Sequence, residues 1–270
     1  MIKDVFLSLL KGGLVGIFGL VPGASIGSLL LCFNSYNDAT EGFSKILNKN
    51  NKKRVLICLP LIIGVILGLL AGFNFIKILT AKYLAQTVFF VVGLLVGGYI
   101  LLLVNSKTKR SLKSILIIIV TFIVFVTIYV LYNQFNLNIP NNILNIILIG
   151  LTLGVTFILP GTSASSYLLI SQKYNHIVNL FSSTSLVNIL LIALLIISFI
   201  IGIIISSKII FNIYKKHKKI FLPLFEGLLL ASIAIIILQI ESFTFDFVNI
   251  FTTILTFLWG YILAKNIVKE

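Results

Sequence analysis

Six long apolar runs, separated by short polar segments, dominate the hydrophobic pattern of this 270-residue chain. About 20 apolar residues in a helix span the hydrocarbon core of a bilayer, and each run is close to that length. The runs cover residues 55–73, 85–104, 115–132, 185–206, 220–238 and 248–264. The pattern predicts an all-α polytopic membrane protein that forms a single membrane domain over residues 1–270.

Two further apolar regions, residues 12–34 and 143–170, are each interrupted by a Pro-Gly pair followed by small hydroxyl residues. The first interruption reads VPGASIGS over residues 21–28, and the second reads LPGTSASS over residues 159–166. Shared Gly, Pro, Ser and Leu positions align the two regions at one fixed offset. A self-match of this kind indicates an internal repeat.

The Pro-Gly pairs predict a break in each of these helices. Proline removes a backbone donor and glycine lets the chain turn, so neither run should continue as one straight helix. Unpaired backbone is too costly to face lipid, so the break is expected inside protein or beside a wet cavity. We expect two re-entrant helical hairpins, each with its tip inside the membrane. The alternative is that Pro-Gly only kinks two full spans, which would give eight crossings.

Composition excludes a soluble domain, because 59% of the residues are hydrophobic, 10% are charged and the mean hydropathy is +1.15. The first apolar run, residues 5–10, is too short for a cleavable signal peptide. Cys32 and Cys58 lie in apolar runs and match no metal or disulfide spacing, which predicts free buried thiols.

The basic residues predict the orientation of the chain. With the N-terminus inside, only Lys77, Lys82 and Lys173 of the 21 Lys and Arg residues fall outside. Positive residues gather on the cytoplasmic side of membrane proteins, where they meet an anionic leaflet. We therefore expect cytoplasmic N- and C-termini, and no nucleic-acid partner for the net charge of +14.

This topology makes the repeat an inverted one. Residues 1–132 hold a re-entrant hairpin (12–34) and three spans, and residues 133–270 hold a second hairpin (143–170) and three spans. Three is an odd number, so the second half lies upside down relative to the first. The two tips can then meet near the midplane, which is a recurring transporter design with alternating access.

The tips carry the candidate binding residues. Backbone N–H groups, hydroxyl groups and the positive end of a helix dipole together suit a phosphate or carboxylate. The candidates are Gly23, Ser25, Gly27, Ser28, Gly161, Thr162, Ser163, Ser165 and Ser166. Ser25 and Ser163 are also expected to cap the outgoing half-helices. Ser and Thr are, however, ordinary packing residues in membrane helices as well.

Glu226 is the only acidic residue inside a predicted span. An intramembrane carboxylate is a functional hypothesis by default, so Glu226 is our candidate carrier of a coupling proton or ion. The alternatives are a protonated side chain, or one that extends toward Lys218 and Lys219. No catalytic set, metal-ligand spacing or nucleotide loop is visible in the sequence, and no metal or cofactor is expected.

The pattern G-x-x-x-G-(x)5-P-G-x-S occurs twice, and a span containing G-L follows each copy, at Gly93 and at Gly227. This arrangement resembles the polyprenyl-phosphate transporter family, the PopT-type proteins long catalogued as a domain of unknown function. The resemblance implies a flippase, not an enzyme, in a bacterial cytoplasmic membrane. It would return undecaprenyl phosphate from the outer to the cytoplasmic leaflet for cell-wall polymer synthesis. Gly23, Ser25, Gly161 and Ser163 match the tip glycines and serines of the family, so the resemblance implies the same role for them. Gly19 and Asn37 stand where the family has acids, and Ile26-Gly-Ser replaces G-G-T.

Two other functions stay open. Integral-membrane undecaprenyl-diphosphate phosphatases share the inverted repeat, but their tip reads P-G-x-S-R-S and is paired with E-x-x-x-E. Ile26 and Ala164 stand at the Arg positions here, and phosphoryl chemistry needs that charge. The third candidate is an ion-coupled carrier of another small anion. The sequence leaves open whether the protein forms a homo-oligomer.

Overall fold

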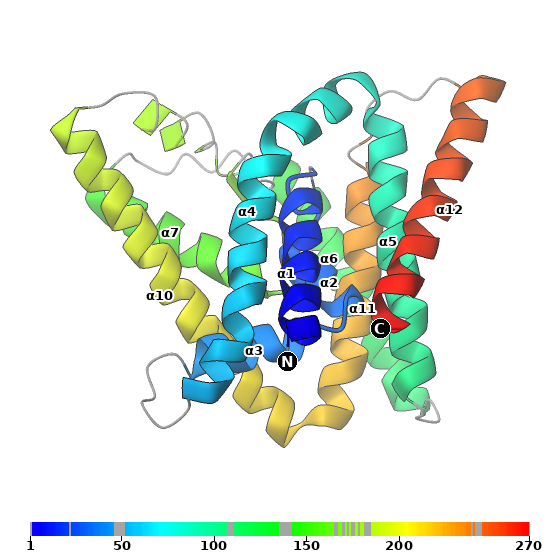
Figure 1. The fold of residues 1–270 in the computed structure, drawn as a ribbon, viewed down its shortest axis with the longest axis horizontal. Helices are drawn as coiled ribbons and strands as arrows, with labels where there is room; N and C mark the ends of the chain where they lie inside the picture. Colours follow the sequence, from blue (N-terminus) through cyan, green and yellow to red (C-terminus); the bar gives the residue numbers. More distant parts are fainter. Residues whose placement is uncertain are drawn as a thin grey trace.

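The computed structural model describes most of the chain. The described residues are 2–21, 23–45, 52–106, 111–134, 142–164, 167–168, 171, 173, 176–177, 179–180, 185–238, 240 and 245–269. All regular secondary structure within them is helical (Figure 1). The predicted all-α class is therefore confirmed for this part of the protein.

Six helices are long and apolar enough to cross a membrane. They are α4 (Lys52–Lys82), α5 (Leu84–Ser106), α6 (Leu112–Gln134), α10 (Leu186–Lys216), α11 (Lys218–Leu238) and α12 (Phe247–Lys269). Large apolar side chains such as Leu70, Leu116 and Leu190 are exposed on their outer faces. So wide an apolar surface is typical of a protein surrounded by lipid. The six predicted spans correspond to these six helices.

Two of the predicted spans end too early. Helix α4 continues to Lys82, beyond the predicted end at residue 73, and α10 continues to Lys216, beyond residue 206. Both extensions contain lysines, such as Lys77 and Lys208. Hydropathy falls where a helix leaves the hydrocarbon, but the helical hydrogen bonds continue past that point.

Four shorter helices build the inner part of the structure. Helices α1 (Ile2–Phe18) and α2 (Ile26–Cys32) flank the first Pro-Gly pair, and α7 (Ile143–Ile158) ends just before the second. Helix α3 (Tyr36–Ser44) follows α2. Gly23 and Gly161 have φ angles of 78° and 83°, a left-handed conformation that glycine adopts most readily. The backbone therefore leaves its helix at both Pro-Gly positions with a glycine in the same conformation.

Close glycine contacts join α1 to α4 and α7 to α10. At Gly16 a side chain would collide with the backbone of Val65 and Leu69, and at Gly154 one would collide with that of Phe199. Small residues at such crossings let helix backbones approach each other and pack densely. Figure 1 shows α7 and α10 side by side, leaning away from the α1–α4 pair.

The other four long helices form two pairs, each between helices that are far apart in the sequence. Helix α5 packs on α12, and α6 packs on α11. Gly93 of α5 lies against the backbone of Phe257, and Gly227 of α11 lies against that of Ile118. Each of these pairs combines one helix from residues 1–132 with one from residues 133–270.

Helix α2 lies in the core of the molecule. It contacts α1, α3, α5 and α7, and every residue from Gly27 to Cys32 is buried. Leu29 and Leu30 pack there with Val91 and Leu95 of α5. The first Pro-Gly tip is thus held inside the protein, as expected for backbone that leaves a helix at membrane depth.

Candidate functional site

The two tips lie in direct contact. A side chain at Gly27 would place its Cβ 2.5 Å from the carbonyl oxygen of Ile158 and 2.9 Å from the backbone nitrogen of Pro160. Glycine is needed here because the start of α2 packs on the backbone that leads out of α7. Gly27, predicted as a binding residue, therefore has a packing role in this structure.

Two hydrogen bonds join the tips. The backbone N–H of Gly161 donates to Ser28 Oγ over 2.9 Å, and Ser25 Oγ donates to the carbonyl oxygen of Leu159 over 3.3 Å. Two residues from each Pro-Gly motif thus meet, although the two motifs are far apart in the sequence. The sequence predicted that both motifs contribute to one place, and the fold brings these parts of them together.

Ser25 has a second role as a helix cap. Its Oγ accepts from the backbone N–H of Ser28 over 3.4 Å, at the start of α2. This is the capping role that the sequence predicts for Ser25. Ser25 and Ser28 are 1% and 0% exposed, so both hydroxyls are removed from solvent.

A third helix joins the contact through a residue that sequence reasoning missed. Ser28 Oγ donates over 3.2 Å to Ser232 Oγ of α11, which donates in turn to Leu229 O over 2.9 Å. Ser232 ends the stretch GLLLAS that begins at Gly227, so the only sequence signal was its place in that motif. Ser28 therefore links the first tip, the second tip and α11.

Thr162 completes the second tip. Its Oγ1 donates to Leu159 O over 2.8 Å and to Thr156 O over 3.2 Å, which closes the chain back onto the end of α7. Leu159 O therefore accepts from hydroxyls of both tips. Ser163 is 7% exposed beside it, and the predicted residues Ser165 and Ser166 lie outside the described part of the chain.

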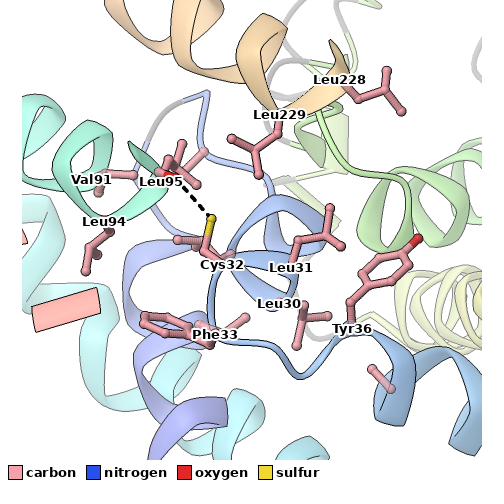
Figure 2. Packing of buried hydrophobic residues seen from close by; sticks show 14 of the residues in the cluster. Leu30, Leu31, Cys32, Phe33, Tyr36, Val91, Leu94, Leu95, Leu228 and Leu229 are labelled. Atoms are coloured by element: carbon pink, nitrogen blue, oxygen red, sulfur yellow. Dashed lines mark hydrogen bonds between the residues drawn. The ribbon is translucent and has the colours of Figure 1, made fainter. Parts of the chain in front are cut away.

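Apolar side chains surround the tip contact. Figure 2 shows Leu30, Phe33, Leu94 and Leu229 gathered around α2, and the thiol of Cys32 donates to Leu95 O over 3.5 Å. Cys32 and Cys58 are both free and buried, as predicted. In such surroundings an unpaired polar group is costly, so the hydrogen bonds between the tips stabilise the closed arrangement.

Glu226 lies in α11, about two helical turns after its start at Lys218, and is partly buried. The preceding residue, Phe225, packs edge-on against Tyr36 with ring centroids 5.0 Å apart. Glu226 is thus on the helix that also supplies Ser232 to the tip contact.

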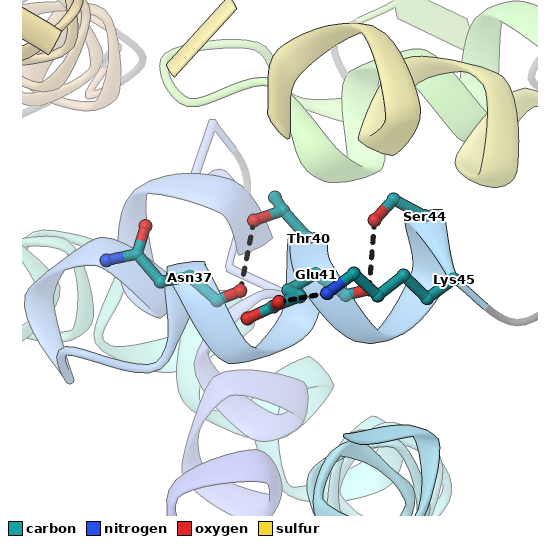
Figure 3. A network of polar contacts seen from close by, with 5 residues as sticks. All are labelled: Asn37, Thr40, Glu41, Ser44 and Lys45. Carbon is teal, nitrogen blue, oxygen red and sulfur yellow. Dashed lines mark hydrogen bonds and ion pairs between the residues drawn. The ribbon is translucent and has the colours of Figure 1, made fainter. Parts of the chain in front are cut away.

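Helix α3 carries a polar network of its own (Figure 3). Glu41 and Lys45 form an ion pair, Ser44 donates to Glu41 O over 2.9 Å, and Thr40 donates to Asn37 O over 3.2 Å. Helix α3 packs between α4 and α10, and the ammonium groups of Lys45 and Lys215 lie 5.4 and 4.7 Å from the ring centroid of Phe211. This network fixes one end of α3 to α10.

Two surface grooves lie away from the tips. One runs along α6 between Leu112 and Thr121, and the other lies beside the start of α7, near Asn142 and His176. Neither groove is lined by a residue of the tip contact. The tips themselves are held together by the Gly27 contact and by the two hydrogen bonds between them.

Comparison with known proteins identifies the family. Residues 98–244 match the VCA0040-like family, described as undecaprenyl phosphate translocase-like. The chain belongs to this family. The matched segment includes the second tip, from Ile158 to Ala164, and the whole of α11 with Ser232.

A similarity to one curated protein covers nearly all of the chain. The polyprenyl-phosphate transporter of Staphylococcus aureus (strain NCTC 8325 / PS 47) is 27% identical over 273 residues, which is 97% of this chain and 95% of that protein. No solved structure matches. The resemblance found in the sequence motifs is confirmed by the family match and supported by this relative.

Proposed function

We propose that this protein carries undecaprenyl phosphate, a polyprenyl phosphate, across the cytoplasmic membrane of a bacterium. The direction is from the outer to the cytoplasmic leaflet, which returns the lipid carrier for cell-wall polymer synthesis. The observation that carries the proposal is the buried contact between two Pro-Gly tips in a chain of the undecaprenyl phosphate translocase-like family. The name of the Staphylococcus aureus relative supports the same substrate class.

The donors of the tip contact are the groups that would hold the phosphate. Four groups of the tips donate to neutral oxygens of the protein in the closed structure. They are Gly161 N–H, Ser25 Oγ, Ser28 Oγ and Thr162 Oγ1. A phosphate oxygen is a stronger acceptor than a carbonyl or hydroxyl oxygen, because the bond is charge-assisted. The headgroup can therefore replace these internal bonds and separate the tips without leaving a donor unsatisfied.

The helix pairs support a rocking mechanism between two inverted halves. The glycine contact of α1 with α4 has its counterpart in α7 with α10, and the contact of α5 with α12 has its counterpart in α6 with α11. Equivalent pairs of this kind are expected around a pseudo-two-fold axis in the membrane plane. In our proposal the tips form two re-entrant hairpins, and the halves rock about them so that the site opens to one leaflet at a time. The isoprenoid tail stays in lipid throughout.

The same proposal includes an orientation and a coupling step. Figure 1 draws both chain ends in the lower half of the view, on the side where α10 passes into α11. This arrangement supports placing both termini on one side of the membrane, and the lysines at the end of α10 and the start of α11 favour the cytoplasm as that side. Glu226 is our candidate for carrying a coupling proton. Changing Glu226 to Gln should leave lipid binding intact and remove the response of transport to a pH gradient.

The residues at the two positions where the phosphatases have Arg argue against the phosphatase alternative. Ile26, at the Arg position of the phosphatases, packs its side chain beside Gly19, and Ala164 packs in a second apolar cluster with Ile146 and Leu153. These positions supply no charge to a leaving phosphate. Binding and release of an intact phosphate fit them better than phosphoryl transfer.

Reconstitution into liposomes tests the function directly. The protein is incorporated into vesicles loaded with a polyprenyl phosphate, and a membrane-impermeant reagent measures how fast headgroups disappear from the outer leaflet. We expect rapid loss with the protein and slow loss with Ser28→Ala. Ser198→Ala is the matched control, because the Ser198 hydroxyl donates to Leu194 O and Leu195 O of its own helix, away from the tips. This change should leave transport within about twofold.

The same preparation separates the alternatives. Release of inorganic phosphate from a polyprenyl diphosphate would favour a phosphatase. Uptake of a soluble phosphate ester without a prenyl tail, at the rate of the lipid, would favour a carrier of small anions. Headgroup movement that is equal in protein-free and protein-containing vesicles would reject the proposed transport.

A further inference from the structure

Helix α11 touches both Pro-Gly tips. Its Ser232 Oγ accepts from Ser28 Oγ of the first tip over 3.2 Å. Its Leu228 carbonyl packs against Gly161 of the second tip, where a Cβ would lie 2.7 Å from the carbonyl oxygen. Leu228 and Ser232 are four residues apart, so they lie on one face of the helix. This face of α11 therefore forms a third side of the place where the two tips meet.

The Ser28 hydroxyl is the point where the three elements come together. Ser28 Oγ lies 2.9 Å from the Gly161 nitrogen and 3.2 Å from Ser232 Oγ. Ser28 and Ser232 are both 0% exposed, so solvent has no access to either hydroxyl. Gly161 N–H and Ser28 Oγ are two of the groups that we propose for the phosphate. A phosphate that binds both of them comes within hydrogen-bonding reach of Ser232.

The direction of the hydrogen bonds shows that the Ser232 proton can change its acceptor. Ser28 Oγ accepts from Gly161 N–H, so its own proton points to Ser232 Oγ. The Ser232 proton in turn points to Leu229 O over 2.9 Å. Leu229 lies inside α11, where a carbonyl already accepts from the N–H four residues later. The bond from Ser232 is an additional one, so the hydroxyl can turn away without leaving this carbonyl unsatisfied.

We propose that Ser232 is a phosphate-binding residue and that α11 is the third wall of the phosphate site. When phosphate oxygens take over Gly161 N–H and Ser28 O–H, Ser232 no longer accepts from Ser28 and donates its proton to the same phosphate. A charge-assisted bond then replaces the weaker bond to Leu229 O. This inference rests on the proposed function, since it adds a binding residue for the same substrate.

A purely structural role for Ser232 predicts the opposite effect on affinity. If Ser232 only accepts from Ser28, Ser232→Ala leaves the buried Ser28 O–H without this acceptor in the free protein. Phosphate binding would relieve that cost, so the affinity would rise. If Ser232 donates to the phosphate, the same change removes a donor and lowers the affinity. The sign of the change therefore decides between the two roles.

Calorimetric titration of the full chain in detergent measures this affinity. The probe is farnesyl phosphate, a phosphate monoester with an isoprenoid tail, and farnesol supplies the same tail without the phosphate. A hydrogen bond to a charged group corresponds to roughly a ten- to hundred-fold change in affinity. We expect Ser232→Ala to raise the Kd for farnesyl phosphate about tenfold or more, with no comparable effect on farnesol. An unchanged or lower Kd for farnesyl phosphate, or an equal effect on farnesol, overturns the inference.

Ser206→Ala is the matched control. Ser206 of α10 is buried and donates to Ile203 O over 3.1 Å, three residues back, as Ser232 does to Leu229 O. The Kd of this variant should stay within about twofold of the wild type. Ser232→Cys is a second test, because a thiol nearly keeps the shape of the side chain but donates weakly. It should also raise the Kd, and it decides the question if Ser232→Ala folds poorly.

The outcomes separate this inference from the proposed function. Wild-type protein that binds farnesyl phosphate but moves no polyprenyl phosphate in liposomes rejects the transport, while the titrations still decide the role of Ser232. Wild-type transport that Ser28→Ala slows, combined with unchanged binding in both Ser232 variants, overturns the Ser232 role alone. Equal losses of affinity in Ser232→Ala and Ser206→Ala also overturn it, because they would show a general effect of removing a buried hydroxyl.

Discussion

Replacing Gly27 with alanine should force the two tips apart. The new Cβ would lie 2.5 Å from Ile158 O, and ordinary contact begins at 3.4 Å, so the two segments must separate by 0.9 Å or more. A shift of that size along the Gly161 N–Ser28 Oγ bond would lengthen it from 2.9 Å to about 3.8 Å, which is too long for a hydrogen bond. Overpacking costs about 1–3 kcal/mol and the lost bond about 1 kcal/mol. The closed arrangement should therefore be weakened by about 2–4 kcal/mol, or roughly 30- to 700-fold in its population ratio.

The thiol of Cys32 can report this opening. It is 1% exposed on α2 and lies against Gly98 of α5, so it should react with a maleimide only when α2 moves. In a Cys58→Ala background, the labelling rate follows the fraction of molecules in which α2 is displaced. We expect Gly27→Ala to raise this rate at least 30-fold and to slow transport strongly.

Gly13→Ala is the matched control for this experiment. A Cβ at Gly13 would meet its nearest atom, Gly64 O, at 3.9 Å, which is ordinary contact. Labelling and transport should stay at the wild-type level. Unchanged labelling and transport in Gly27→Ala would refute the reasoning, since they would mean that the tips do not pack as closely as described.

Three further variants test other parts of the structure. Ser28→Ala leaves Gly161 N–H without its acceptor, so the protein should lose about 1–3 kcal/mol of stability, measured as a lower melting temperature in detergent. Gly161→Ala places a side chain at φ 83°, where strain of roughly 1–3 kcal/mol is expected, and the same melting assay should show a loss that Gly13→Ala does not. Phe211→Leu removes the ring under Lys45 and Lys215, which should lower the melting temperature by a few degrees and leave transport within about twofold, because each cation–π contact is worth about 0.5–1 kcal/mol. A melting temperature equal to the wild type in any of the three would contradict the corresponding contact.

The apolar pattern predicted the spans well because lipid exposure demands long uninterrupted runs. It failed at the ends of α4 and α10, where lysines lower the hydropathy but leave the helical backbone unchanged. It also missed α3, which lies outside all of the predicted apolar runs. Tyr36, Ala39, Thr40 and Phe43 have the spacing of one helix face, so the signal for α3 was present.

The candidate site was predicted in part. The Pro-Gly repeats identified Ser25, Ser28 and Gly161, because proline and glycine restrict the backbone in ways that sequence shows directly. Ser232 could not be predicted as the partner of Ser28, because 204 residues separate them and only the packing of α11 brings them together.

The exchange of partners between α5, α6, α11 and α12 has a consequence for how the protein is made. Helix α5 packs on α12, which follows α11 in the sequence, and α6 packs on α11. During synthesis, the first half enters the bilayer before α12 exists, so α12 does not yet cover the glycine-lined face of α5. The α5–α12 contact therefore forms only after α12 has been translated, and a product that stops before α12 would expose this face of α5 to quality-control proteases.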